Sequence, residues 1–237
     1  MKGIYAQFLL EKAWIITKRT GDSSKAWSWA DTLPVAKLKI PTISLDQIVL
    51  EGEEIEAMAF GPAIIESSLE SKNIIIAGHR DSFFRNLGEL KEGDIINIDV
   101  TAIVNGWHGD TSRMFFVGDV SPKCKNLVSA TYNSMMKSIS IIKKGIHLGD
   151  IGETIQTYVE KKGFSVVRDF CGHGIGKTFH EPPNILHYGK KGEGIKLEEG
   201  MIFTVEPMIN AGLNNTKLLN DGWTAVTKDK SLSAQFE

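Results

Sequence analysis

Two aspartates are the first residues in this sequence with the type and spacing for metal or acid–base chemistry. Residues 95–104 alternate as a strand, the turn signal Asn105-Gly106 follows, and 110–118 is typical of the return strand, so a β-hairpin is predicted. With the hairpin centred just before Asn105, Asp99 lies directly opposite Asp110. Because like charges facing each other destabilise a sheet, this pair requires a cation between the carboxylates or a proton on one of them. Two aspartates on a solvated face are the alternative interpretation.

Three more ligand-type residues follow in separate segments. His173 stands among glycines in the run 171–176, where a backbone without Cβ lets a ligand or metal come close; a hydrogen-bonded core histidine is an equal alternative. Glu206 is the single carboxylate of the apolar, strand-like run 201–208, and its burial without a partner would be costly. Glu237 ends the chain beside an aromatic side chain.

Together these residues form an oxygen-rich set of two aspartates, two glutamates and one histidine. Such a set suits a pair of Mn, Fe, Co or Zn ions better than it suits a structural zinc. Two ions about 3.5–4 Å apart can activate one bridging water and stabilise both ends of a displacement. His180, seven residues after His173, would then be free to hydrogen-bond a substrate or a tetrahedral intermediate. The pattern therefore favours a paired-metal catalytic site.

The elements that must position these residues change character near residue 94. Before it we expect an opening helix with apolar side chains at helical spacing (Ile4, Phe8, Ile15 or Ile16), then short strands at 35–41, 48–50 and 73–78. After it we expect a helix over about 123–143, with Gly145 as its C′ residue. A second helix is expected to start at Asp150, with Glu153 completing a capping box, and to end at Gly163.

Composition narrows the class of protein. The 237 residues are 42% hydrophobic and 24% charged, which is typical of a folded globular chain. A formal net charge of −2 argues against a generic nucleic-acid binder. Cys124 and Cys171 cannot build a disulfide framework and suit a reducing compartment. No run of ~18 apolar residues and no signal segment are present, so we expect no transmembrane segment and a cytoplasmic location.

Residues 94–237 resemble the carboxy-terminal part of a type I methionine aminopeptidase. The matching runs are Ile98-Asp99-Val100-Thr101, His108-Gly109-Asp110-Thr111-Ser112, Gly172-His173-Gly174-Ile175-Gly176, Phe203-Thr204-Val205-Glu206-Pro207-Met208, Asp221-Gly222-Trp223 and Ser233-Ala234-Gln235-Phe236-Glu237.

The resemblance implies a pita-bread fold, in which two divalent ions are held in a central cleft, and removal of an amino-terminal methionine from peptides. It implies five metal ligands: Asp99, Asp110, His173, Glu206 and Glu237. Of these, Asp110 and Glu237 would bridge the two ions. It also implies that Glu206 helps to activate the water, and that His180 and Trp223 contact the substrate. The partner implied is a peptide or nascent chain, with the ribosome surface as a possible docking place and no specific nucleic acid.

The sequence departs from this family in its first 93 residues. The His-Gly-Ile/Val-Pro run that supplies a substrate-contacting histidine in the family is absent, so no residue is assigned to that role. Instead, residues 1–93 resemble the first half of a Gram-negative sortase, on the runs 29–41, 48–52, 59–62 and 77–84, with His79 at the position of the family's histidine. The sortase cysteine strand is missing, and a histidine without its nucleophile cannot run acyl transfer.

We therefore expect an α+β hybrid. A sortase-like, β-rich fragment would occupy residues 1–93, and a partial pita-bread, metal-binding catalytic region would occupy 94–237. Because each fragment lacks the half that would bury its own hydrophobic face, we interpret the join as an artefact rather than a gene fusion. The expected function is a methionine aminopeptidase with an incomplete pocket, and the alternative is a catalytically inert hybrid or binding protein.

Overall fold

The chain folds into two compact units in the computed structural model. The structure describes residues 2–29, 32–52, 55–64, 76–78, 83–220 and 224–237. The first unit comprises 1–91, 98–110 and 176–179, and the second comprises 92–97, 111–175 and 180–237. The β-hairpin that carries the two aspartates thus contributes its tip to the first unit and its base to the second.

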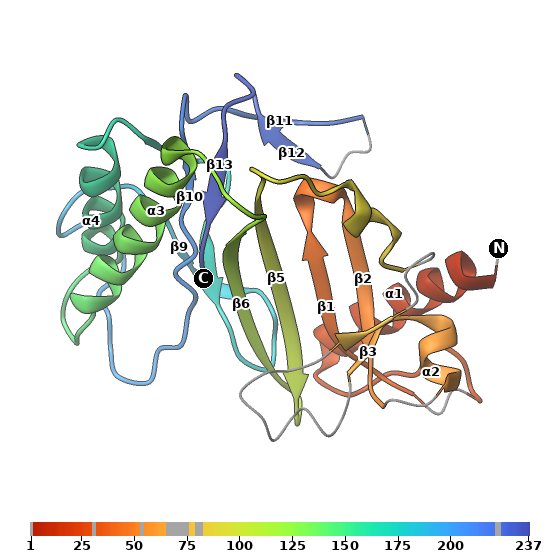
Figure 1. The fold of residues 1–237 in the computed structure, drawn as a ribbon. Coiled ribbons are helices and arrows are strands. Elements are labelled where there is room, and N and C mark those ends of the chain that lie inside the picture. The colour runs from red at the N-terminus through yellow and green to blue at the C-terminus, as the bar shows by residue number, and fades with distance from the viewer. Residues whose placement is uncertain (1, 30–31, 53–54, 65–75, 79–82, 221–223) are drawn as a thin grey trace. The chain divides into compact units, whose positions relative to one another are not determined.

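The first unit packs one long helix against part of a sheet. The described elements are α1 (Lys2–Thr20), β1 (Pro34–Ile40), β2 (Leu45–Leu50), α2 (Ile55–Phe60), β3 (Ala63–Ile64) and β4 (Ile76–Ala77) (Figure 1). The sheet has the order β4-β3-β2-β1-β5-β6, in which β5 (Ile95–Val104) and β6 (Trp107–Phe116) form the hairpin. The opening helix and the expected strands at 35–41 and 48–50 are confirmed, whereas most of the expected strand at 73–78 lies outside the described residues.

The apolar stripe expected on the opening helix does not face the core. Leu10 and Trp14 are fully buried against Ile48 and Leu50 of β2. The helix therefore has a buried apolar side, completed by Ala6 and Ala13, and a different apolar side that is exposed.

The second unit is built from two helices and short strands. It contains α3 (Pro122–Ser140), α4 (Leu148–Glu160), β7 (Ser165–Val166), β8 (Gly172–Gly174), β9 (Glu181–Ile185), β10 (Met208–Asn210), β11 (Thr216–Leu218), β12 (Ala225–Thr227) and β13 (Ser233–Gln235). Its described strands pair as β13-β10-β7, β8-β9 and β11-β12. The core lies under α3 and α4, with Leu127, Ile151, Ile155, Val159 and Ile209 fully buried.

Both expected helices of this unit are present, with different boundaries. The helix α3 begins after Ser121, whose hydroxyl oxygen accepts a hydrogen bond from the Cys124 amide at 3.3 Å. The expected start of α4 at Asp150 was wrong, because Asp150 is the third helical residue and its carboxylate accepts a hydrogen bond from the His147 amide at 2.7 Å. Gly163, at φ 81°, does end α4 as expected.

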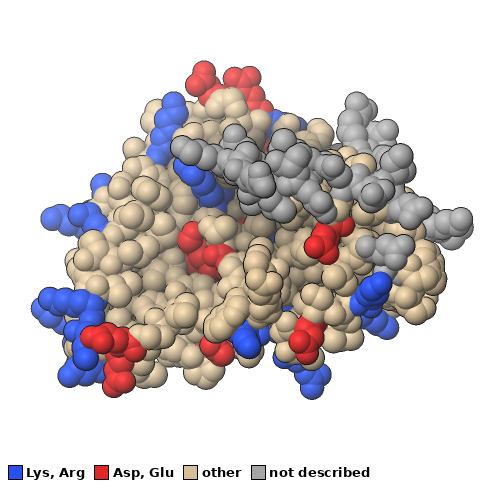
Figure 2. All heavy atoms as spheres, turned by 90° about the horizontal axis from the view of Figure 1, so that it is seen from below, with Lys and Arg blue, Asp and Glu red and all other residues tan. Residues whose placement is uncertain are grey.

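Charged side chains show no segregation by sign on the face drawn in Figure 2. In the described residues visible there, lysine and arginine are interspersed with aspartate and glutamate among uncharged atoms. This distribution agrees with the near-zero net charge of the sequence. In the part of the chain that the structure describes, no helix is both long and apolar enough to cross a membrane.

Candidate metal and catalytic site

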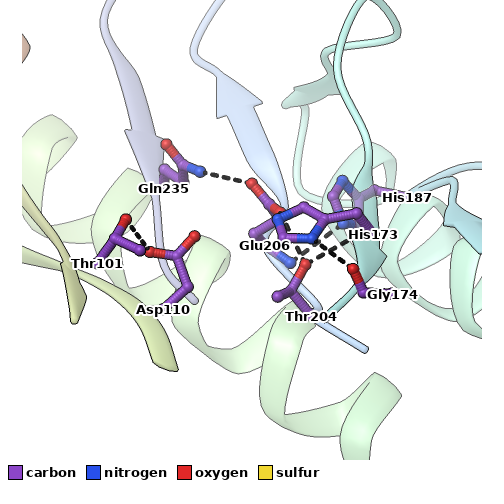
Figure 3. Close-up of polar contacts among 8 residues, drawn as sticks. All are labelled: Thr101, Asp110, His173, Gly174, His187, Thr204, Glu206 and Gln235. Atoms are coloured by element: carbon purple, nitrogen blue, oxygen red, sulfur yellow. Dashed lines mark hydrogen bonds and ion pairs between the residues drawn. The ribbon is translucent and has the colours of Figure 1, made fainter. Parts of the chain in front are cut away.

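The two aspartates lie on the tip of the β5–β6 hairpin in the first unit. Both turn residues, Asn105 and Gly106, have positive φ (51° and 77°), so the hairpin is centred between them. Thr101 therefore faces Asp110, and its hydroxyl donates a hydrogen bond of 2.7 Å to Asp110 Oδ1 (Figure 3). The expected register was wrong by two residues, because the turn uses both Asn105 and Gly106 as its central pair. Asp99 still shares a face with Thr101, since side chains alternate along a strand, and is diagonal to Asp110.

The environment of Asp99 disfavours its ionised form. Burial, followed by the negative charge of Asp110, raises the pKa of Asp99 from 3.8 to about 6. Lys39 opposes this shift, because it is the residue opposite Asp99 on β1. Burial and a nearby like charge both disfavour an ionised carboxylate, so they act in the same direction on Asp99.

Lysines of the first unit contribute positive charge that acts on Asp99, namely Lys39 and Lys18. Lys37 makes ion pairs with Glu11 of α1 at 2.8 Å and with Asp46 of β2 at 2.9 Å. Burial, together with the charges of Lys39 and Lys37, lowers the pKa of Lys18 to about 8. Elements that precede residue 94 thus place positive charge beside the aspartates.

His173 of the second unit lies on β8 between two glycines. A Cβ on Gly172 would lie 2.5 Å from the Thr204 carbonyl oxygen, and one on Gly174 would lie 2.4 Å from that of Pro182. The expectation that these glycines admit a ligand was wrong, because neighbouring backbone occupies the space. The His173 amide donates to Thr204 Oγ1 at 3.0 Å, and its Nδ1 lies 2.9 Å from the Gly174 carbonyl oxygen.

Glu206 is held from three sides within the second unit. Thr204 Oγ1 donates to its Oε1 at 2.8 Å, and Gln235 Nε2 donates to its Oε2 at 3.3 Å. Its own amide donates to His187 Nε2 at 3.1 Å (Figure 3). The expected strand at 201–208 was wrong in extent, because only Met208–Asn210 forms a continuous ladder there.

His187 is a buried, neutral acceptor. It is 2% exposed, and burial lowers its pKa to about 3. Because Nε2 accepts a hydrogen bond, the ring proton is on Nδ1. The imidazole therefore fixes the Glu206 backbone without contributing charge.

The geometry of His173 and Glu206 fits a cation. The His173 proton is assigned to Nδ1 by the neighbouring carbonyl oxygen, so Nε2 presents a lone pair. That nitrogen lies 3.5 Å from Glu206 Oε1, and both atoms are good ligands for the metals considered above. The exposed ring of His180 stands perpendicular to that of His173, with centroids 4.2 Å apart, where it can reach a bound substrate.

Glu237 is anchored through its backbone. Its amide donates to the Ser112 carbonyl oxygen at 3.0 Å, and its carbonyl oxygen accepts from Thr111 Oγ1 at 3.2 Å. Phe236 is buried and packs edge-on against Tyr132 of α3. These contacts fix the backbone position of Glu237.

The structure thus groups the expected residues by unit: Asp99 and Asp110 in the first, and His173, His180, Glu206 and Glu237 in the second. Trp223 lies outside the described residues, as does His79. The sequence interpretation missed Thr101, Thr204, Gln235 and His187. Thr101, Thr204 and Gln235 each lie two residues from an expected ligand. Because side chains two residues apart in an extended chain point to the same side, this spacing could have revealed them. His187 has no such local signal.

Most of this chain is similar in sequence to known proteins. The model of metallopeptidase family M24 matches residues 31–237. The methionine aminopeptidase of Rickettsia prowazekii is 62% identical over 149 residues, covering 62% of this chain and 58% of that protein. Methionine aminopeptidase B of Synechocystis is 60% identical over 148 residues, covering 62% and 54%.

Solved structures give the same result. The crystal structure of the Rickettsia prowazekii enzyme has a TM-score of 0.61 at 61% identity, covering 62% of this chain and 60% of that one. Methionine aminopeptidase from Thermotoga maritima has a TM-score of 0.62 at 41% identity, covering 68% and 64%. The chain spans a little over half the length of the curated relatives it matches.

The α+β architecture and these similarities define the pita-bread fold of the M24 metallopeptidases. The chain belongs to metallopeptidase family M24. The family match begins at residue 31, so it includes much of the segment that resembles a sortase.

Proposed function

We propose that this protein is a metal-dependent methionine aminopeptidase that removes the first methionine of peptides. The observation that carries this proposal is the approach of His173 Nε2 to Glu206 Oε1, with the His180 ring beside them, in a chain of family M24. The names of the relatives support the reaction and the substrate class.

The proposed metal centre has four carboxylates and one imidazole as its ligands. Two divalent ions (Co, Mn, Fe or Zn) would be held by Asp99, Asp110, His173, Glu206 and Glu237. When bound, they supply a nucleophilic water at neutral pH and polarise the scissile carbonyl.

The roles of the chain's own residues follow from their contacts. Glu206 accepts the proton of the attacking water and passes it to the leaving amine, and its hydrogen bonds from Thr204 and Gln235 fix its carboxylate for that transfer. His180 donates a hydrogen bond to the oxygen that gains negative charge in the tetrahedral intermediate. Trp223 is proposed to contact the substrate side chain.

The substrates are nascent or free peptides with an amino-terminal methionine, encountered in the cytoplasm and at the ribosome surface. Residues 1–93 would be a sequence fragment of sortase-like origin joined at 93/94 to the aminopeptidase region, and the sequence runs quoted above support this origin. The competing proposal is that the protein is a catalytically inert hybrid, because the matched region spans only 58% of the Rickettsia prowazekii relative.

Hydrolysis of a methionyl tripeptide with added Mn²⁺ or Co²⁺ tests the function. We expect metal-dependent turnover that is lost in Glu206→Ala and kept in Glu199→Ala, whose carboxylate is exposed and pairs with Lys144. Mn²⁺ binding measured calorimetrically on the same three proteins separates the two candidates. Metal binding without turnover would support the inert hybrid, and equal turnover in wild type and Glu206→Ala would refute the assignment.

A further inference from the structure

The helix α1 has two apolar sides, and the fold uses only one. Leu10, Trp14, Ala6, Ala13 and Thr17 are buried in the first unit, and the helix lies along β1 and β2 (Figure 1). The opposite side exposes four large apolar side chains, at 49–66% of their area: Tyr5, Phe8, Ile15 and Ile16. Their spacing follows the 3.6-residue period, so they form one continuous stripe.

The charges on this exposed side all have one sign. Lys12 and Arg19 are exposed and fall within the stripe, and the Lys12 ammonium lies 4.4 Å from the centroid of the Phe8 ring. The only acidic residue of the helix, Glu11, points to the sheet, where it pairs with Lys37. The exposed side therefore combines apolar area with uncompensated positive charge from the helix itself.

We propose that this exposed side of α1 docks on the surface of an anionic phospholipid membrane, with the helix lying in the plane of the interface. Aromatic and branched side chains would enter the boundary between headgroups and acyl chains, while Lys12 and Arg19 extend to the lipid phosphates. A helix of 19 residues with its stripe along the length fits a flat lipid surface. A second copy of the chain fits less well, because pairing two such stripes brings lysines and arginines of both helices together. This inference does not depend on the aminopeptidase reaction.

Co-sedimentation of the full chain with phospholipid vesicles tests the proposal. We expect binding to vesicles that contain phosphatidylglycerol, weak binding to pure phosphatidylcholine, and a several-fold loss of binding at high salt. The double variant Phe8→Ser/Ile15→Ser should bind at least about tenfold more weakly, because two apolar side chains leave the interface. The double variant Lys12→Glu/Arg19→Glu should lose the preference for anionic lipid. Circular dichroism verifies that both variants keep the wild-type fold.

A matched control comes from the second unit. Leu213 and Leu218 are 63% and 62% exposed, and their double change to Ser should leave vesicle binding unaltered. Equal binding of wild type and Phe8→Ser/Ile15→Ser would overturn the proposal, as would absence of wild-type binding to anionic vesicles. A concentration-dependent dimer that disappears in this variant would identify a second copy as the occupant instead. The salt dependence of wild-type binding is a test that needs no variant.

Discussion

Thr101 and Asp110 face each other across the β5–β6 hairpin and share a hydrogen bond of 2.7 Å. The hydroxyl donates to an oxygen of a proposed metal ligand, so it fixes the rotamer of the carboxylate before any cation arrives. Groups that orient metal ligands in this way commonly contribute 10–100-fold to metal affinity. Thr101 is buried, which leaves the contact little freedom to relax.

Replacing Thr101 with Val should weaken Mn²⁺ binding by about tenfold, because it removes the donor and keeps the shape. The loss of a hydrogen bond to a charged acceptor should also lower the free energy of unfolding by about 1–3 kcal/mol. Titration calorimetry and denaturant unfolding measure the two effects. Thr101→Ser keeps the hydroxyl and should bind Mn²⁺ nearly as wild type does. Equal loss in both variants would contradict the role of the hydrogen bond, because Thr101→Ser retains the hydroxyl donor.

Asp99 gives the metal-free protein a pH-dependent stability. The folded state raises the pKa of Asp99 to about 6, so ionisation of this group opposes folding. The penalty is absent below about pH 4, grows between pH 4 and 6, and is complete above pH 6. In EDTA, Asp99→Asn should therefore raise the free energy of unfolding by about 1–3 kcal/mol at pH 7 and by much less at pH 4. Chemical denaturation at the two pH values measures the difference, and a gain of the same size at both would contradict the raised pKa.

The sequence predicts the β5–β6 hairpin that carries Asp99 and Asp110, because hydrophobic period and turn chemistry are local. The hairpin was recognised from the Asn105-Gly106 pair, yet its register was misplaced by two residues. Moving the centre of the turn by one position changes the cross-strand partner of every residue on both strands. The local pattern alone therefore could not decide whether Asp99 or Thr101 faces Asp110.

The contacts around His173 and Glu206 needed the folded chain. Gly172 and Gly174 signalled a close approach, but only tertiary pairing shows that the approaching group is backbone from Thr204 and Pro182. His187 reaches Glu206 across 19 positions of sequence, and nothing in its own neighbourhood indicates that contact. Long-range hydrogen bonds of this kind are set by packing and have no periodic signature.

Lys39 should compete electrostatically with a metal ion bound by Asp99. It stands opposite Asp99 on β1, and its charge favours the ionised carboxylate in the metal-free protein. A divalent ion placed at Asp99 is repelled by that ammonium group. Lys39→Met keeps the length of the side chain and should tighten Mn²⁺ binding several-fold. Lys144→Met, at an exposed lysine of the second unit, serves as the control and should have no effect. Weaker binding in Lys39→Met would show that the lysine supports the site.

His187 should matter as an acceptor and not as a base. His187→Leu removes the acceptor of the Glu206 amide in a buried place, which should cost about 1–3 kcal/mol of stability and weaken Mn²⁺ binding. His187→Gln can present an amide oxygen near the position of Nε2 and should recover most of the Mn²⁺ affinity. Calorimetric titration of the three proteins decides, and a Gln variant as impaired as the Leu variant would count against the acceptor role.

The glycine at position 174 should be indispensable to the pairing of β8 with β9. A Cβ there would lie 2.4 Å from the Pro182 carbonyl oxygen and 2.8 Å from that of Glu181, and backbone atoms cannot rotate away as a side chain would. Gly174→Ala should therefore push the two strands apart, lower the free energy of unfolding by more than about 2 kcal/mol and displace the neighbouring His173. Gly109 provides the matched control, because a Cβ on it meets no atom within 4 Å and it directly precedes the ligand Asp110. Gly109→Ala should unfold at nearly the same denaturant concentration as wild type and bind Mn²⁺ equally well. If Gly174→Ala were as stable as Gly109→Ala, the close packing of β8 on β9 would be incorrect, and with it the placement of His173 next to Glu206.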